Sequence, residues 1–376
     1  MAGVISKILK FNLTPGKVVI GVDIGMSAIK VVELSGERGK AVLKNYGEIA
    51  LGPYASTTIG QAVRLSEERI AQALTDVLTE AKIETRKAVL ALPLGATLLS
   101  FIEVPTADEE KLARIIPIEA RKYIPVPISE VTLDWWVLPK HGEITKSQNA
   151  QGEGSANAEQ TSAQMSEVVI SAIHDETLNK FLKIQSVAKL DVKQFEIEIF
   201  SSIRSVIGRD TAPIMVLDMG AGSTKLAMVE YGIVKGYHII NKGGQDVTLA
   251  LASSLEISME KAEEVKRTGG LEGMVDGKKI ADVASTTLEY IFSEAEAEML
   301  KYQRKTGKPV SRLILVGGGS MLKGVDVLAR STLKVEVVRG DPFSKTEAPA
   351  FLETTLREAG PEFAVAIGAA LKALAD

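Results

Sequence analysis

The sequence predicts an α/β protein whose two related domains face each other across a cleft, because one strand–turn–strand motif occurs twice. Two apolar, β-branched runs between residues 18 and 34 flank the turn Asp23-Ile-Gly25, which is typical of a β-hairpin with buried strands. The same pattern returns between residues 214 and 230, with Asp218-Met-Gly220 at the turn. Self-similarity between the halves of a chain indicates two domains of related architecture.

Length and composition limit the classes of protein that fit. The 376 residues, of which 45% are hydrophobic and 24% charged, suffice for two or three domains with a sizeable core. The net charge of −4 argues against a nucleic-acid binder, which would carry a basic surface. The sequence has no cysteine, no signal peptide and no apolar run near the ~20 residues that span a bilayer. We therefore expect a cytoplasmic protein without disulfides or thiolate metal sites.

The elements after the first hairpin resemble half of a ribonuclease-H-like domain. Apolar periodicity predicts, in order, a strand at 40–50, a helix at 66–82 and a buried strand at 87–94. A strand at 98–104 then precedes a helix that begins in the capping box Thr106–Glu109 and that Pro117 must kink or interrupt.

Further elements are predicted by the same patterns. Strands are expected at 131–137, 168–173, 192–197 and 312–316, and helices at 176–188, 200–207, 248–255, 258–267, 280–306 and 363–374. Residues 141–165 are rich in Gln, Ser, Ala, Asn and Gly, which predicts a flexible loop. Residues 1–11 form an amphipathic stretch that could touch a membrane surface. The stretch is too short to be a stable helix alone, so we expect a docked or frayed terminus.

The turn of each hairpin carries residues suited to binding phosphate through a metal ion. Gly25 lets successive backbone N–H groups converge on an anion. Asp23 would repel a bare phosphate, so it fits only if a divalent cation such as Mg²⁺, with waters retained, lies between them. Lys30, seven residues after Asp23, adds positive charge, and the second motif repeats this spacing with Lys225. The second tip, residues 220–224, has more small residues and hydroxyls, which favours close approach by phosphate.

A third glycine turn, Gly317-Gly-Gly319, follows the buried strand 312–316. The chain contains no Gly-x-x-x-x-Gly-Lys-Ser/Thr, and the third turn lacks the spacing Gly-x-Gly-x-x-Gly, so neither a P-loop nor a dinucleotide motif is indicated. Two Asp-x-Gly hairpins followed by this turn resemble the motif order of the actin, sugar-kinase and heat-shock-chaperone ATPase superfamily. In that superfamily two phosphate hairpins, a connecting helix and an adenosine loop surround ATP between two domains.

The resemblance implies a site for ATP, with Mg²⁺ held near Asp23 and Asp218. The implied residues are Asp23, Gly25, Ser27 and Lys30 in the first phosphate loop, Asp218, Gly220, Gly222, Ser223 and Thr224 in the second, and Gly317, Gly318, Gly319 and Ser320 beside the adenine and ribose. Gly243 and Gly244 match a turn that lines the phosphate side. Glu263 and Lys266 match a helix pair near the nucleoside, although an exposed helix face is the alternative for this pair.

Hydrolysis of ATP needs a group that orients the attacking water. The superfamily places an acid or amide at the start of the connecting helix, and Glu198 is the match in this sequence. Glu196 lies two residues away, and either acid could be an ordinary charge at a helix N-terminus. Met26 stands where related loops have a small polar residue, so we expect the first loop to hold phosphate less fully.

Within the superfamily, residues 119–135, with Tyr123-Ile-Pro-Val-Pro127 at their centre, resemble the signature of the PilM family. Residues 21–34 and 313–322 agree with it. The resemblance implies an actin-like fold with an inserted subdomain, ATP binding and a groove for the N-terminal peptide of the inner-membrane protein PilN. It also implies an adaptor, peripheral to the inner membrane, that links the pilus or secretion complex to its cytoplasmic motor ATPases.

The domain boundaries that follow from these assignments are residues 1–85 and 174–211 for the first domain, 86–173 for the inserted subdomain, 212–248 and 309–376 for the second domain, and 249–308 for its subdomain. Two other functions remain open. A cell-division or cell-shape filament protein, like FtsA or MreB, would share the fold and self-associate. A small-molecule kinase would need a catalytic base and a substrate pocket, for which the sequence shows no motif.

Overall fold

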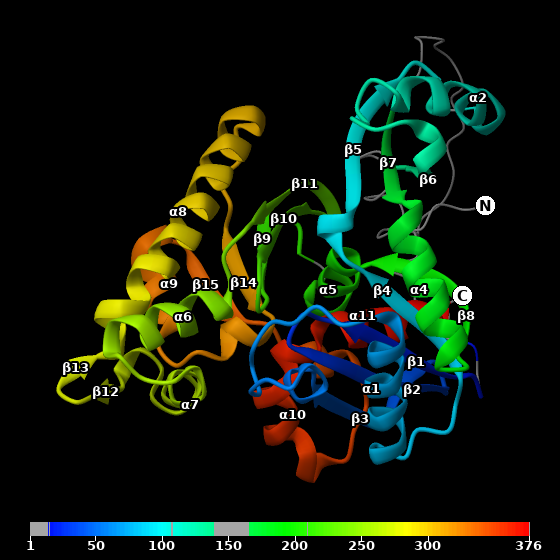
Figure 1. Ribbon diagram of the computed structural model, residues 1–376. Coiled ribbons are helices and arrows are strands. Elements are labelled where there is room, and N and C mark those ends of the chain that lie inside the picture. Colours follow the sequence, from blue (N-terminus) through cyan, green and yellow to red (C-terminus); the bar gives the residue numbers. More distant parts are fainter. Residues whose placement is uncertain (1–13, 15, 107, 139–164, 209, 376) are drawn as a thin grey trace. The chain divides into compact units, whose positions relative to one another are not determined.

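The computed structural model describes residue 14 and residues 16–106, 108–138, 165–208 and 210–375. The amphipathic stretch 1–11 and nearly all of the predicted loop 141–165 lie outside these residues. The described residues form two compact units (Figure 1). One is Leu94–Lys180, called the inserted unit below, and the other described residues make up the main unit. Every helix among the described residues is too short or too polar to cross a lipid bilayer.

The first sheet of the main unit has the strand order β3-β2-β1-β4-β8. Its strands are β1 Val18–Ile24, β2 Ala28–Glu37, β3 Lys40–Ala50, β4 Lys87–Leu92 and β8 Asp191–Ile197. The first three strands form an antiparallel meander, whereas β4 and β8 run parallel to β1. Helix α1, Glu67–Glu80, begins after Ser66, whose side chain accepts a hydrogen bond from the Arg69 N–H as predicted.

The second sheet repeats this order position by position as β11-β10-β9-β14-β15. Its strands are β9 Ile214–Met219, β10 Thr224–Glu230, β11 Ile233–Ile240, β14 Arg312–Val316 and β15 Glu336–Arg339. The apolar core of this half lies between the sheet and the helices α6 Gly244–Leu255, α7 Met259–Gly269, α8 Ile280–Thr306 and α9 Val325–Leu333 (Figure 1). A two-stranded ribbon precedes α8, with β12 Met274–Val275 and β13 Lys278–Lys279. The predicted internal repeat is thus present in the sheets themselves.

The inserted unit is a three-stranded antiparallel sheet of order β5-β7-β6 with helix α2 packed on it. Its elements are β5 Thr97–Val104, α2 Glu109–Ala120, β6 Val131–Val137 and β7 Ser166–His174, with α4 Asp175–Val187 next in the chain. The predicted helix start was wrong, because Asp108 rather than Thr106 accepts the backbone N–H bonds of the first turn. Pro117 does not interrupt α2. The unit begins at Leu94 rather than near residue 86, because β4 pairs with β1.

Two helices cross closely at the base of the main unit: α5, Glu198–Val206, and α11, Ala364–Ala375. A Cβ on Gly368 of α11 would lie 1.9 Å from the Ser201 carbonyl oxygen of α5. A Cβ on Gly21 of β1 would lie 1.9 Å from the Ala366 carbonyl oxygen of α11. Side chains are therefore excluded at both glycines, and the backbones of β1, α11 and α5 pack directly on one another.

A buried ionic cluster fixes the same crossing. Arg204 of α5 donates to Glu196 at 2.7 Å, and both side chains are almost fully buried. Arg204 also donates to the Gly368 carbonyl oxygen at 3.2 Å, and Lys372 Nζ lies 3.5 Å from Glu196. Although burial opposes it, the two cations hold the pKa of Glu196 below its usual range. Breaking such a buried pair leaves an uncompensated charge, so the cluster holds α5 and α11 in register.

We predict that Gly21→Ala lowers the free energy of unfolding by about 2 kcal/mol, because the added methyl group must displace the backbone of α11. Gly236→Ala in β11 is the matched control, since no atom lies within 4 Å of its Cβ position. Urea unfolding of the two variants measures the difference. Equal midpoints would show that α11 is not held against β1 at this point.

Candidate functional site

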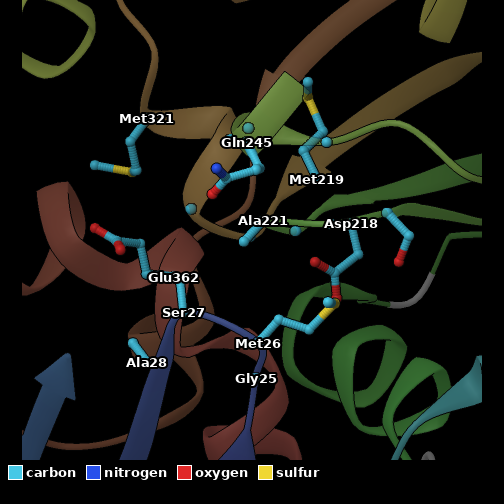
Figure 2. A pocket seen from close by; sticks show the side chains of 18 of the residues that line it. Gly25, Met26, Ser27, Ala28, Asp218, Met219, Ala221, Gln245, Met321 and Glu362 are labelled. Carbon is cyan, nitrogen blue, oxygen red and sulfur yellow. The ribbon is translucent and has the colours of Figure 1, made fainter. Parts of the chain in front are cut away.

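The three glycine turns meet at one pocket of about 400 Å³ in the main unit. The pocket is lined by the tips of the β1–β2 and β9–β10 hairpins, the turn after β14, and the starts of α5, α6 and α11 (Figure 2). The predicted residues that line it are Asp23, Gly25, Ser27, Lys30, Glu198, Asp218, Gly220, Gly222, Ser223, Gly243, Gly244, Glu263, Lys266, Gly317, Gly318 and Gly319. Residues as far apart in the chain as Asp23 and Val365 are therefore gathered around one cavity.

Two predicted residues do not reach the pocket. Thr224 is fully buried and donates its hydroxyl to the Lys242 carbonyl oxygen at 2.8 Å. Ser320 is also fully buried, and its hydroxyl donates to the Gly317 carbonyl oxygen at 2.7 Å. The Ser320 hydroxyl thus closes its own turn, whereas that of Thr224 bonds the backbone 18 residues further along the chain. A spacing rule that counts positions along the chain detects neither bond.

The two hairpin tips close in the same way. In the first, the Gly25 N–H donates to the Ala28 carbonyl oxygen at 3.0 Å, and in the second the Gly220 N–H donates to the Ser223 carbonyl oxygen at 3.0 Å. Each tip is therefore a compact turn directly beyond a buried aspartate-bearing strand. The similarity extends the repeat from the sheets to the hydrogen bonds of the site.

The turn Gly243–Gly244 supports the second tip from behind. The Gly244 N–H donates to the Gly220 carbonyl oxygen at 2.9 Å, and the Gln245 N–H donates to that of Ala221 at 2.8 Å. A Cβ on Gly243 would lie 2.5 Å from the Ala221 oxygen, so only glycine fits there. Helix α6 begins at Gly244, four residues before the predicted start, and its N-terminal dipole favours an anion in the pocket.

The third turn packs on the end of β9. Strand β14 runs parallel to β9 with Val316 opposite Asp218. Gly317 has φ of +80°, and a Cβ there would lie 2.4 Å from Asp218 Oδ1. A Cβ on Gly319 would lie 2.7 Å from that of Met219. Because Gly317 and Gly319 have no side chains, the turn can lie against the end of β9 without filling this side of the pocket.

Three acids and two lysines form the floor of the pocket. Lys225 Nζ lies 3.2 Å from Glu198 Oε2, and Ser202 donates to Asp218 Oδ2 at 3.0 Å. Burial raises the pKa of Asp23 to about 7, and the charges of Glu198 and Asp218 add to this against the opposing charge of Lys30. Burial also raises the pKa of Asp218.

The raised pKa values of Asp23 and Asp218 mean that the positive charge of the nearby lysines does not fully offset the cost of burying the ionised carboxylates. Among the described residues, no group of three His, Cys, Asp or Glu side chains is close enough to hold a metal ion alone. Asp23 and Asp218 fit an ion that takes one or two carboxylates and draws its other oxygens from phosphate and water, as Mg²⁺ does. The donor set therefore fits Mg²⁺ bound together with a phosphate ligand.

The structure separates the two acids between which the sequence left a choice. Glu198 is the first residue of α5 and lines the pocket beside Lys225. Glu196 is held by Arg204 in the buried ionic cluster and does not line the pocket. Only Glu198 is placed to act on a bound ligand.

Glu263 and Lys266 join α6 to α7 rather than forming an exposed helix face. Glu263 is 6% exposed and accepts from the Thr248 hydroxyl at 2.7 Å and from Arg267 Nε at 2.7 Å. Lys266 donates to Glu263 at 2.5 Å and to the Gly244 carbonyl oxygen at 3.2 Å. This network links the helix N-terminus at the hairpin tips to the outer end of the pocket.

Several lining residues carry no sequence motif: Glu48, Gly60, Gln245, Arg267, Met321 and Glu362. Glu48 enters because β3 pairs with β2 so that Glu48 stands opposite Lys30, and the two side chains are 3.3 Å apart. Strand register alone would have located it. Glu362 precedes α11 and faces the third glycine turn, and burial raises its pKa. No local pattern marks these residues, because their place depends on how distant elements pack.

We predict that Asp23→Asn raises the melting temperature by about 2–4 °C at pH 8 in EDTA without nucleotide. The folded pKa of about 7 lies above the ordinary 3.8. Folding therefore binds a proton between these values, and the ionised acid destabilises the folded state above pH 7. The gain should largely disappear near pH 4, because the folded acid then holds its proton and the unfolded acid, with its ordinary pKa of 3.8, is close to half protonated. Asp276→Asn, in an exposed turn, is the control. An equal gain at both pH values would refute a buried, proton-binding Asp23.

Comparisons with known proteins place this fold. A solved PilM-PilN type IV pilus biogenesis complex matches 95% of this chain and 98% of that one, at 28% identity and a TM-score of 0.78. The cell division protein FtsA of Pseudomonas aeruginosa is 22% identical over 89% of this chain and 85% of that protein. FtsA of Neisseria meningitidis serogroup B is 27% identical, over 34% of this chain and only 36% of that protein.

More distant structures share the architecture. MreB5 of Spiroplasma citri bound to ADP matches 94% of this chain and 95% of that one, with a TM-score of 0.51 at 12% identity. The actin-like fold predicted from the two hairpins is thereby confirmed. The family model for type IV pilus assembly protein PilM matches residues 21–374. This chain therefore belongs to the PilM family of type IV pilus assembly proteins.

Proposed function

We propose that this protein binds Mg·ATP in the pocket between its two hairpin tips and acts as a nucleotide-dependent adaptor in pilus assembly. The observation that carries the proposal is the convergence of three glycine turns on an acidic floor within one pocket. Its volume of about 400 Å³ lies within the range of about 300–1,000 Å³ that ligand pockets commonly have.

The phosphates would lie between the hairpin tips and the start of α6. Backbone N–H groups at residues 26–27 and 221–223 would supply donors, and the dipole of α6 would add to them. Asp23 and Asp218 would hold Mg²⁺, which neutralises phosphate charge when bound. The lysines beside these acids, Lys30 and Lys225, add positive charge at the same end.

The nucleoside would extend toward the outer end of the pocket. There the Glu263–Lys266 network and the third glycine turn offer polar groups and close backbone approach. The MreB5 structure of the same fold holds ADP, which supports a nucleotide as the ligand of this chain too.

Glu198 is the residue we assign to hydrolysis. It begins α5 at the pocket floor, where Lys225 fixes its carboxylate at 3.2 Å. A carboxylate in this place can orient a water and accept its proton. Affinity comes from the glycine turns and the metal, whereas turnover depends on this group, so binding and hydrolysis are separable.

The partner we assign is the N-terminal cytoplasmic peptide of PilN. Support comes from the solved relative, which is a PilM-PilN complex and matches nearly the whole chain. Binding PilN would hold the protein at the inner membrane, where it would link the assembly complex to its cytoplasmic motor ATPases. A cell-division or cell-shape filament protein remains the alternative.

Calorimetry with Mg·ATP tests the site. We expect wild-type protein to bind with a Kd in the micromolar range, and Asp218→Asn to weaken binding at least about 30-fold, because the metal loses a carboxylate. Asp276→Asn is the control. Unchanged affinity in Asp218→Asn would refute the two-hairpin site.

The same titration, repeated with a synthetic PilN N-terminal peptide, tests the adaptor. A change in nucleotide affinity when the peptide is present, and a reciprocal change in peptide affinity, would demonstrate coupling. Nucleotide binding with no response to peptide would instead favour the filament protein, which sedimentation with and without ATP then tests.

We predict that Glu198→Gln leaves the Kd for Mg·ATP within about threefold of wild type but lowers phosphate release at least about 100-fold. Glu196→Gln should instead affect mainly the stability of the fold. It disturbs the buried pair with Arg204 and lowers the melting temperature, but because Glu196 does not line the pocket, phosphate release should fall far less than in Glu198→Gln. Single-turnover assays with radiolabelled ATP measure phosphate release in both variants. Normal turnover in Glu198→Gln would remove Glu198 from the mechanism.

A further inference from the structure

The tip of the first hairpin carries a methionine that touches the tip of the second. A Cβ built on Gly222 would lie 2.6 Å from Met26 Sδ and 3.1 Å from its Cε. The thioether therefore rests directly on the Gly222 backbone, while Met26 remains 44% exposed to solvent and lines the pocket. Figure 2 shows its side chain extending toward Asp218, on the side away from Met321 and Glu362.

Met26 also occupies the space that a side chain at position 222 would take. Gly222 does not have a positive φ, so its backbone conformation is open to other residues. Among the described residues, Met26 alone supplies atoms within 4 Å of the Cβ position. The two tips thus contact each other through a sulfur atom.

A strap formed by residues 60–63 holds the backbone of the first tip in place. The Val63 N–H donates to the Met26 carbonyl oxygen at 2.9 Å. The Ala62 N–H donates to Gln245 Oε1 of α6 at 2.7 Å. A Cβ on Gly60 would lie 2.5 Å from the Glu263 carboxyl carbon, so the strap also lies against α7. With the tip fixed, the thioether can leave Gly222 only by turning about its own side-chain bonds.

We propose that Met26 sets the phosphate selectivity of this site, by occupying the space where the last phosphate of a nucleoside triphosphate would contact both tips. The inference rests on the proposed nucleotide site. The nucleoside end lies by Glu263 and the third glycine turn, so the phosphate farthest from it meets Met26 beside Asp218.

The chemistry of the side chain explains the direction of the effect. A thioether has no hydrogen to donate, so a phosphate oxygen facing it loses a water without gaining a bond. The side chain is unbranched and flexible, so it can be displaced but keeps competing for the space. The third phosphate consequently adds less binding free energy here than it would in a site whose two hairpin tips were unobstructed.

Calorimetric Kd values for Mg·ATP, Mg·ADP and adenosine test the proposal in wild type, Met26→Ser and Met26→Ala. We expect Met26→Ser to tighten Mg·ATP binding about tenfold, because a hydroxyl donates to the phosphate. Met26→Ala should tighten it about threefold, since it only removes the obstacle. Mg·ADP should gain less than Mg·ATP, and adenosine should gain nothing.

Two results would overturn the proposal: equal Mg·ATP affinity in all three proteins, or an equal gain for adenosine. The first, with micromolar binding retained, leaves the proposed nucleotide site standing. If none of the three proteins binds nucleotide while each melts cooperatively, the proposed function and this inference both fail.

Methionine methyl NMR gives a second reading that does not depend on affinity. In protein labelled with ¹³C at the methionine methyl groups, Met26→Ala identifies the Met26 signal. This signal should move on adding Mg·ATP, move less with Mg·ADP and stay still with adenosine. Gly222→Ala should shift it without any ligand, whereas the control Gly236→Ala should not. A Met26 signal that ignores Mg·ATP would contradict the proposal.

Discussion

The pocket depends on the direct backbone packing of β1, α11 and α5. Gly21 and Gly368 remove the side chains that would keep these elements apart. The ion pair of Arg204 with Glu196 then fixes the contact in a buried, low-dielectric place, where a broken pair is costly. Because Glu198 begins α5, this crossing sets the position of the pocket floor.

The two halves of the main unit share one architecture. Each half builds a sheet of the same order, and in each the hairpin of the first two strands ends in a turn that carries an aspartate just before it. The halves differ where they meet the ligand. The first tip has Met26 and is braced by the strap, whereas the second has Gly222 and is braced by the turn Gly243–Gly244. The repeat supplies the framework, and these local differences supply any selectivity.

The sequence predicted the elements whose signals are local. Both hairpins, the third glycine turn and the long helix α8 were found because apolar periodicity and glycine turns depend on neighbouring residues. The start of α2 was predicted wrongly because the side chains of Thr106 and Asp108 can both cap a helix. The backbone conformation determines which of the two does so, and in the structure it is Asp108.

The remaining features of the site depend on distant contacts. Glu48 reaches the pocket through strand register, and Thr224 and Ser320 turn away from it to bond backbone carbonyls. The contact of Met26 with Gly222 joins residues 196 positions apart (222 − 26 = 196). No motif in either segment predicts such a contact, because it exists only once both hairpins are folded.

The strap has a practical consequence for observing the protein in motion. Its hydrogen bonds to Met26 and Gln245 are made by the main-chain N–H groups of Val63 and Ala62, so most side chains can be exchanged there without removing them. The sequence contains no cysteine. A single cysteine at position 62 would thus be the sole thiol in the molecule and would carry one dye next to Gln245, which lines the pocket. Its fluorescence would report changes in the surroundings of the strap in real time.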